Sequence, residues 1–460
     1  MNFYFGASNT LDRLDAKKGS IKGLIGSLPE KDRKRTAALV IETLKFKPAL
    51  LDVIAAAELM KEKKLTSVNL ALVLVHDLLL GKGIQAGDGP LKQAVLRHKT
   101  RLNGELQKLK AKRGLQSTAE LGQSADVRAA QIPRYVRVNT SMWSVSAALE
   151  YLASCGYTLR DCVSSDPKAF ARDEHIPSLL LFPPQTAFHN DPAYKAGKLI
   201  LQDKASCFPA VVLAPPSQPL VRVIDATAAP GNKTTHLSAL MGNTGKLFAF
   251  ERDRKRFGTL SMMVSRAGCT NVDPVNADFL TVDPQDAKYA DVTHILLDPS
   301  CSGSGIVNRL DYLLESEEDS QEEEDERLEK LAAFQLLMIR HAMKFPKVTK
   351  IVYSTCSIHA MENERVVVAA LACDEAREGQ FVLAGRDEVL PAWHRRGLPE
   401  EMESADSVVR CKPGEDATNG FFVSCFVRQS KKRKADGEIA RQQKKKRRKR
   451  PKAVVASSST

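Results

Sequence analysis

Residues 220–234 read LVRVIDATAAPGNKT, an apolar run that opens into a loop of small residues. The apolar part predicts a buried strand, and the small side chains around Pro230 let the loop backbone approach a ligand closely. The same apolar pattern predicts further strands at 246–250, 271–275, 292–297 and 349–353. Because helix-length segments separate these runs, we expect an α/β fold with an open, Rossmann-like parallel sheet.

The loop at 225–234 lies where an open α/β sheet binds its ligand, beyond the carboxyl end of a strand. It contains neither a G-x-G-x-x-G nor a Walker sequence, because Asn232 interrupts the Gly-Lys pair that the Walker sequence needs. A pyrophosphate is therefore a poor match, whereas S-adenosylmethionine, with a nucleoside end and an amino-acid end, is a good one. Glu251 after the second strand is placed to bind both ribose hydroxyls, and Asp278 after the third is placed to reach the adenine amino group.

Two cysteines each end a later apolar run, Cys301 in the sequence DPSCSG and Cys356 in the sequence YSTCS. Carbon 5 of a pyrimidine is not nucleophilic, so its methylation requires a thiolate to add first at carbon 6. That thiol needs positive charge nearby, which Lys233 can supply, while Asp298 can hold the amino edge and ring nitrogen of a cytosine. A single cysteine is usually a small buried apolar residue, but two at strand ends favour covalent catalysis, with either thiol as the nucleophile.

The net charge of +13 is unevenly distributed along the chain. Residues 428–452 hold 14 Lys and Arg against 2 acids, and residues 1–135 hold 24 against 13, whereas residues 315–326 hold 9 acids and no base. Separated basic regions predict a polyanionic partner, for which nucleic acid is the usual choice. The basic clusters at 431–434 and 444–450 predict localisation to the nucleus and nucleolus.

The composition disfavours two classes of protein. The longest apolar stretch, residues 70–80, is too short to span a bilayer and contains His76 and Asp77, so we expect no membrane segment. The 9 cysteines lack paired C-x-x-C spacing, so we expect neither a metal site nor a disulfide framework. The sequence therefore predicts a soluble protein of a reducing compartment.

Periodicity and composition divide the chain into four parts. Apolar residues spaced by three and four predict helices in the first part, and a strand–helix–strand order predicts a small α+β unit in the second. The acids at 315–326 cannot pack in a core, so we expect a solvated loop there, followed by a helix at 328–343. The predicted parts are a helical RNA- or partner-binding domain (1–120), an α+β RNA-binding subdomain (131–197), an S-adenosylmethionine-dependent methyltransferase domain (198–428) and a disordered basic tail (429–460).

Short motifs accompany the loop and the two cysteines. They are PRYVRVN at 133–139, LQDKAS at 201–206, ENE at 362–364 and GFFV at 420–423. With these motifs, the chain from about residue 130 to residue 428 resembles the Sun-domain (Fmu-type) RNA cytosine-5 methyltransferases. The Asn232-Lys233 pair, the helical N-terminus and the basic tail are similar to those of the eukaryotic member that methylates large-subunit ribosomal RNA.

The resemblance implies a role for each candidate site residue. Chemistry alone permits either thiol as the nucleophile, but the resemblance implies Cys356, with Cys301 helping to release the product and with Asp298 and Lys233 completing the catalytic set. The implied cofactor-binding residues are Thr227, Ala228, Ala229, Pro230, Gly231, Asn232, Lys233, Glu251, Arg256, Asp278 and Asp298. The chain departs from the family where Asp-Ala-Pro-Cys becomes DPSC and where Cys-Ala-Ala-Pro-Gly-Gly-Lys becomes TAAPGNK. These changes leave the aspartate and both thiols in place.

We therefore expect an S-adenosylmethionine-dependent RNA cytosine-5 methyltransferase that acts as a monomer on large-subunit ribosomal RNA or a pre-ribosome. One alternative is an RNA-binding ribosome-assembly factor whose methyltransferase fold is not catalytic, although the intact thiols, Lys233 and Asp298 argue against it. A second alternative is cytosine-5 methylation of tRNA or another RNA. Methylation of protein would need neither a covalent thiol nor basic flanking regions.

Overall fold

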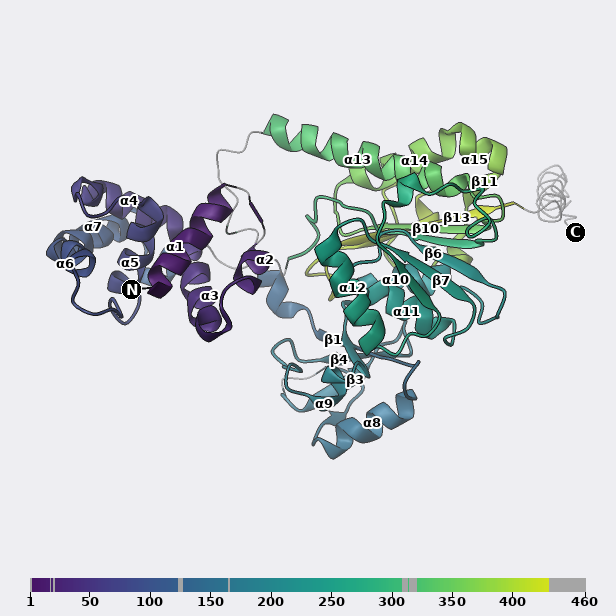
Figure 1. Ribbon diagram of the computed structural model, residues 1–460, viewed down its shortest axis with the longest axis horizontal. Helices are drawn as coiled ribbons and strands as arrows, with labels where there is room; N and C mark the ends of the chain where they lie inside the picture. The colour runs from purple at the N-terminus through teal and green to yellow at the C-terminus, as the bar shows by residue number, and fades with distance from the viewer. Residues whose placement is uncertain are drawn as a thin grey trace, which may run out of the picture. The chain divides into compact units, whose positions relative to one another are not determined.

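The computed structural model describes residues 2–16, 18–19, 21–122, 127–163, 166–307, 313 and 321–429. The chain forms two compact units, residues 1–129 with 308–321 and residues 130–307 with 322–460. The predicted basic tail from residue 430 onward and residues 315–320 of the predicted acidic loop lie outside the described residues. Figure 1 labels many of the helices and strands in each unit.

The N-terminal unit is helical, as its apolar spacing predicts. Its helices are α1 (Asn2–Asp15), α2 (Ile21–Gly26), α3 (Glu30–Lys45), α4 (Lys47–Ala56), α5 (Val68–Leu79), α6 (Pro90–Arg97) and α7 (Lys99–Lys112). Helix α5 contacts α1, α3, α4, α6 and α7, and every residue from Leu70 to Val75 is buried. The Ser67 side chain begins this helix by accepting a hydrogen bond from the Leu70 amide at 3.2 Å. An apolar helix that is buried on all sides therefore organises this unit.

The second unit begins with a small mixed sheet. Its strands are β1 (Arg134–Val138), β2 (Thr158–Leu159), β3 (Ala169–Arg172), β4 (Leu179–Phe182) and β5 (Leu199–Leu201), in the order β2-β3-β4-β1-β5. Helices α8 (Val145–Ser154) and α9 (Pro192–Lys195) accompany it, and Leu152 of α8 packs in one cluster with Val136 and Phe170. Strand β5 pairs antiparallel with β1, so this subdomain extends beyond residue 197, where the sequence analysis ended it.

A larger, mainly parallel sheet forms the rest of the unit. Its strands are β6 (Arg222–Asp225), β7 (Lys246–Phe250), β8 (Val272–Val275), β9 (His294–Leu297), β10 (Lys350–Thr355), β11 (Phe381–Leu383), β12 (Val409–Cys411) and β13 (Phe421–Arg428). The order is β11-β13-β10-β9-β6-β7-β8, with β12 beside β13. Strands β6 to β10 are parallel, and β13 is antiparallel to its neighbours β10 and β11. The predicted Rossmann-like class is confirmed, and its five predicted strands are β6 to β10.

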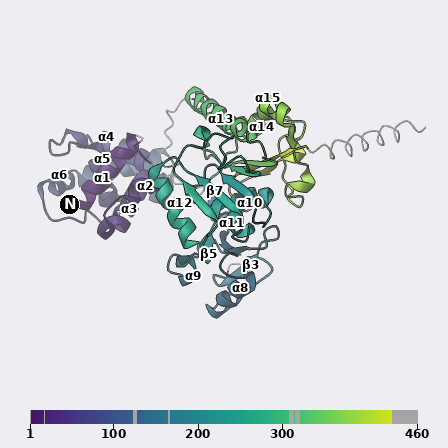
Figure 2. The same ribbon diagram turned by 45° about the vertical axis from the view of Figure 1, so that its right-hand side comes forward.

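Helices cover both faces of this sheet. They are α10 (Lys204–Leu213), α11 (Asn232–Leu240), α12 (Arg254–Arg266), α13 (Gln321–Met343), α14 (Glu364–Ala372) and α15 (Asp374–Gly379). Helices α10, α11 and α12 lie on one face and α13, α14 and α15 on the other, as Figures 1 and 2 show. From β6, the chain order runs through β7 and β8 in one direction and through β9 and β10 in the other. The β6–β9 pair is therefore the switch point at which such sheets bind ligands.

Helix α13 begins earlier than the sequence analysis predicted. Its first turn contains Glu322, Glu323 and Glu324, which are exposed, so residues 321–326 are helical rather than part of a loop. Acidic side chains in a first turn interact favourably with the partial positive charge of a helix N-terminus. Acid-rich sequence thus excluded burial here but did not exclude a solvated helix.

Candidate active site

The loop after β6 is shaped by its small residues. Gly231 has φ +114°, and a Cβ atom there would lie 3.0 Å from the Cβ of Met263. The Ala228 amide donates a hydrogen bond to the Phe250 carbonyl at 2.8 Å, which fixes the loop against the end of β7. Helix α11 begins directly after Gly231. Gly231 therefore lets the loop pack closely against α12, directly before the N-terminus of α11.

Thr227 links this loop to the loop that follows β9. Its hydroxyl accepts a hydrogen bond from the Asp298 amide at 3.0 Å. The threonine that departs from the family pattern therefore has a structural role at the switch point. Asp225, at the end of β6, is fully buried and accepts a 2.7 Å hydrogen bond from the Thr234 hydroxyl. Burial raises the pKa of Asp225 to about 6, although the bond from Thr234 opposes this rise.

Lys233 and Asp298 form an ion pair at the centre of the site. The Lys233 ammonium donates to Asp298 Oδ2 at 2.7 Å and to the Ser206 hydroxyl at 3.3 Å. Ser354, in β10, donates to Asp298 Oδ1 at 2.7 Å. Burial is the largest single influence on the pKa of Lys233 and would lower it, but the charge and hydrogen bond of Asp298, with the charges of Cys356 and Asp225, together raise the pKa. Lys233 is thus held as a cation, and both carboxylate oxygens of Asp298 have donors.

The two cysteines meet beside this ion pair. The Sγ atoms of Cys301 and Cys356 are 3.2 Å apart. The contact with Cys356 raises the pKa of Cys301 most strongly, and burial and the negative charges of Asp298 and Glu362 raise it further. A Cys356 thiolate in turn contributes to raising the pKa of Lys233, and because this attraction is reciprocal, the Lys233 cation stabilises that thiolate. The Lys233 cation therefore lies where it can interact with a Cys356 thiolate, and Cys356, burial and nearby carboxylates all oppose ionisation of Cys301.

The remaining predicted cofactor residues lie at the ends of β7 and β8. Glu251 is buried and accepts a hydrogen bond from the Asp253 amide at 2.8 Å. Arg256 lies 3.6 Å from Glu251 Oε2 and donates to the Ala229 carbonyl at 2.8 Å, which joins Glu251 to the loop. Asp278 accepts from the Leu280 amide at 3.0 Å and lies beyond β8, one strand further from the thiols.

The carboxylates of Glu251, Asp278 and Asp298, which follow strands β7, β8 and β9 of the sheet, suit S-adenosylmethionine. This cofactor carries a cationic sulfur, an ammonium group and two ribose hydroxyls, all of which carboxylates can bind.

Within the described ranges of the chain, no group of three or more His, Cys, Asp or Glu residues could hold a metal ion. Likewise, none of the helices that the structure describes is long and apolar enough to cross a membrane.

Several residues of the site were missed by the sequence analysis. Ser206 and Ser354 bind the ion pair, and the aromatic ring of Phe421 lies 5.3 Å from the Lys233 ammonium. Gln335 and Glu362 contact the backbone on either side of Cys301. Four of the five stand in sequences singled out above, which was the available signal: Ser206 in LQDKAS, Ser354 in YSTCS, Glu362 in ENE and Phe421 in GFFV. Gln335 lies within an ordinary helical pattern.

A Rossmann-like sheet with a small-residue loop and two adjacent thiols at its switch point defines a methyltransferase domain built for covalent attack on a base. A family model described as 16S rRNA methyltransferase RsmB/F matches residues 210–427. Models of the N-terminal domain and of the ferredoxin-like domain of NOL1/NOP2/Sun domain family member 5 match residues 34–121 and 132–202.

Curated relatives match along nearly the whole chain. The 25S rRNA (cytosine-C(5))-methyltransferase rcm1 of Schizosaccharomyces pombe is 46% identical over 432 residues, covering 92% of this chain and 91% of that protein. The 28S rRNA (cytosine-C(5))-methyltransferase of Mus musculus is 43% identical, covering 93% of this chain and 91% of that protein. The chain therefore belongs to the NOL1/NOP2/Sun family of S-adenosylmethionine-dependent RNA cytosine-5 methyltransferases, which confirms the resemblance inferred from its motifs.

Solved structures agree on the fold. A methyltransferase homolog protein from Pyrococcus horikoshii superposes with a TM-score of 0.52, covering 83% of this chain and 99% of that one. The two sequences are 22% identical, so this likeness shows the shared fold alone.

Proposed function

We propose that this protein methylates carbon 5 of a cytosine in large-subunit ribosomal RNA, with Cys356 as the covalent nucleophile. One observation carries the mechanism: two thiols 3.2 Å apart beside the half-buried Lys233–Asp298 ion pair. The substrate class is supported by the relatives, which are named as methyltransferases of 25S and 28S rRNA.

The cofactor edge of the sheet is proposed to hold S-adenosylmethionine, which supplies an electrophilic methyl group on a cationic sulfur. Glu251 would bind the ribose hydroxyls, because it ends β7 and is already linked through Arg256 to the loop. Asp278 would accept from the adenine amino group. The loop residues 227–233 would line the space between these carboxylates and Asp298.

In the first proposed step, the Cys356 thiolate forms a bond to carbon 6 of the cytosine. The π electrons of the 5,6 double bond move into the ring, which makes carbon 5 nucleophilic. Asp298 accepts a hydrogen bond from the exocyclic amino group, and the Lys233 cation offsets the negative charge that develops on the ring. Carbon 5 then bonds to the methyl group as the methyl–sulfur bond breaks, and the electron pair stays on the departing sulfur.

Release requires a base and a leaving thiolate. Once Cys356 is bonded to carbon 6, it no longer carries charge or a thiol proton, so the largest cause of the raised pKa of Cys301 is removed. Cys301 can then lose its proton to solvent and take the proton from carbon 5. The electron pair of that C–H bond restores the 5,6 double bond as the Cys356–carbon 6 bond breaks. The cycle ends as it began, with a Cys301 thiol beside a Cys356 thiolate.

The activity is tested by methyl transfer to RNA from cells that lack the protein. We expect label from S-adenosylmethionine to enter large-subunit ribosomal RNA, and bisulfite sequencing to locate one or few protected cytosines that depend on the protein. Label in tRNA alone would redirect the substrate assignment. No transfer to any RNA would favour the non-catalytic assembly factor.

We also propose that the protein works in the nucleolus, because the basic clusters at 431–434 and 444–450 can act as a localisation signal and can bind RNA non-specifically. Truncation after Val427 should leave methyl transfer intact and disperse the protein through the cell, as followed by fluorescence microscopy. Unchanged nucleolar staining of the truncated protein would contradict this role.

A further inference from the structure

The motif ENE places three polar side chains in the protein interior beside the thiols. Glu362, Asn363 and Glu364 connect a 3-10 turn (Ala360–Glu362) to helix α14, and each has 0% of its surface exposed. Buried carboxylates and amides are costly unless they are hydrogen-bonded. The partners of these three side chains therefore indicate what the motif holds in place.

Glu362 holds the loop that carries Cys301. Its Oε1 atom accepts hydrogen bonds from the Ser302 amide at 2.9 Å and from the Gln335 side-chain amide at 2.9 Å. That same Gln335 nitrogen donates to the Ser300 carbonyl at 3.1 Å. Glu362 and Gln335 together thus contact the backbone on both sides of Cys301.

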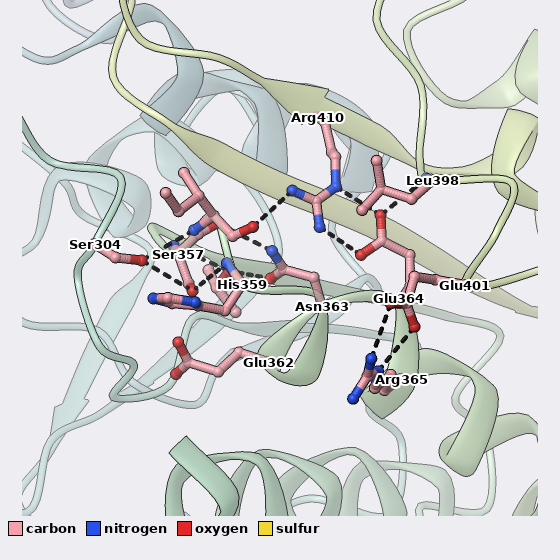
Figure 3. Close-up of polar contacts among 12 residues, drawn as sticks. Ser304, Ser357, His359, Glu362, Asn363, Glu364, Arg365, Leu398, Glu401 and Arg410 are labelled. Atoms are coloured by element: carbon pink, nitrogen blue, oxygen red, sulfur yellow. Dashed lines mark hydrogen bonds and ion pairs between the residues drawn. The ribbon is translucent and has the colours of Figure 1, made fainter. Parts of the chain in front are cut away.

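Asn363 holds the loop that carries Cys356 in the same way. Its Oδ1 atom accepts from the Thr355 hydroxyl at 2.5 Å, and its Nδ2 atom donates to the Ser357 carbonyl at 3.0 Å. Figure 3 shows Asn363 directed toward Ser357, with Glu364 turned to the opposite side. There, the Glu364 carboxylate accepts two 2.6 Å hydrogen bonds from Arg410. Asn363 thus contacts residues on both sides of Cys356, and Glu364 anchors the motif to β12.

We propose that Glu362 and Asn363 are positioning residues that set the two thiols at their working separation, Glu362 acting on Cys301 and Asn363 on Cys356. This inference rests on the proposed function, because it assigns the two thiols to adduct release and adduct formation. Adjacent residues are joined by one rigid peptide unit, about 3.8 Å between Cα atoms. One short turn of chain therefore contacts the backbone beside both thiols, whose Sγ atoms are 3.2 Å apart.

If Glu362 and Asn363 only stabilised the fold, their alanine variants should show the same defect. The proposal instead predicts that the Glu362 variant is slow in adduct release and the Asn363 variant is slow in adduct formation. The test uses the full chain and two RNA substrates, large-subunit rRNA transcripts made with cytosine and with 5-fluorocytosine. Fluorine at carbon 5 leaves no proton to remove, so the second substrate reports adduct formation without release. The first substrate reports how long the adduct persists on denaturing gels.

Glu362→Ala should form adduct with 5-fluorocytosine RNA at close to the wild-type rate. With ordinary RNA its adduct should persist ~100-fold longer, the loss expected when a reacting group is misplaced by about 1 Å. Glu362→Gln should restore release, because a glutamine oxygen can still accept from the Ser302 amide and from Gln335. Asn363→Ala should instead form adduct ~100-fold more slowly on both substrates, without a longer-lived product.

The matched control is Glu375→Ala. It removes the ion pair of Glu375 with Arg340 of α13 (2.9 Å), the helix that carries Gln335, without touching either thiol loop. This variant should not alter the balance between formation and release. The inference is overturned if Glu362→Ala and Asn363→Ala show the same defect, or if Glu362→Gln does not restore release. Absence of adduct even with Cys301→Ala would instead reject the proposed covalent function itself.

Discussion

Cys356 lies directly after β10, which pairs with β9 on one side and with β13 on the other, whereas Cys301 lies in a loop beyond the end of β9. Cys356 is therefore held by the sheet as well as by Asn363, whereas the loop of Cys301 is held by the side chains of Glu362 and Gln335. The charged groups around the two thiols also differ. A Cys356 thiolate interacts with the Lys233 cation, whereas Cys301 interacts with Asp298, Glu362 and Cys356.

The contrast bears on an ambiguity that the sequence leaves open. Two thiols at neighbouring strand ends are chemically equivalent candidates for the nucleophile. Their surroundings differ, because Cys356 interacts with the Lys233 cation whereas Cys301 has a raised pKa, and this difference supports the proposed roles. A nearby cation suits Cys356 as the nucleophile that must attack first. A raised pKa suits Cys301 as a base that is needed only after methyl transfer to the cytosine.

The largest expected effect comes from removing each thiol in turn. Cys356→Ala should abolish methyl transfer and give no covalent complex, because no other group can add to carbon 6. Cys301→Ala should methylate once and stall, leaving an RNA–protein adduct on denaturing gels. Adduct from Cys356→Ala and none from Cys301→Ala would reverse the two roles.

Lys233→Met tests whether the cation distinguishes the two thiols. The variant keeps an apolar stem but loses the charge that stabilises the Cys356 thiolate, so adduct formation should slow by ~10²–10³-fold. Rates of trapping by 5-fluorocytosine RNA measure this step alone. Ser206→Ala, which loses only the 3.3 Å contact with Lys233, is the matched control and should have a much smaller effect. Wild-type trapping by Lys233→Met would remove the electrostatic basis of the comparison.

Much of this site could be predicted because local sequence determines it. An apolar run followed by small residues specifies both strand β6 and its loop, and the end of each parallel strand brings Asp225, Glu251 and Asp298 to one edge. The cysteines follow the same rule. Fold class and candidate residues were therefore readable from the chain alone.

Other features depend on contacts between distant segments and could not be read in this way. Gln335 contacts Ser300, 35 positions away, from the middle of a helix whose pattern only reports burial. Strand β5 has three residues and is defined by its pairing with β1, so its sequence gave no boundary at residue 201. The first turn of α13 was misjudged because high charge excludes a core position without excluding a helix.

Glu251→Ala tests whether the cofactor edge is independent of the thiol pair. Loss of a charge-assisted hydrogen bond costs ~1.5–3 kcal/mol, so S-adenosylmethionine affinity should fall by roughly one to two orders of magnitude. Calorimetry measures this change, and RNA affinity, which should hardly change, serves as the internal control. Adduct formation without cofactor should also persist, since Glu251 is remote from Cys356 in the sheet order. Normal cofactor affinity would contradict the assignment of Glu251.

The smallest expected effect is a shift in the pH dependence of Cys301 alkylation. In the wild-type protein the pKa of Cys301 is raised, first by its contact with Cys356 and then by burial. Its reaction with iodoacetamide, followed by mass spectrometry, should therefore still be increasing at alkaline pH. Cys356→Ser retains a polar neighbour of similar size but cannot ionise in this range, so it removes the repulsion between two thiolates. The pKa of Cys301 should fall, and the midpoint of its alkylation should move to lower pH.

The midpoint is the informative quantity because a change in access alone alters the rate at every pH and leaves the midpoint in place. Cys269, whose pKa is raised by burial rather than by another thiol, provides a control within the same protein. Its profile should be identical in both proteins. An unchanged Cys301 midpoint in Cys356→Ser would show that burial and the carboxylates dominate the titration of Cys301. In that case, the contact between the two thiols would not explain why Cys356 acts before methyl transfer to the cytosine and Cys301 acts only after it.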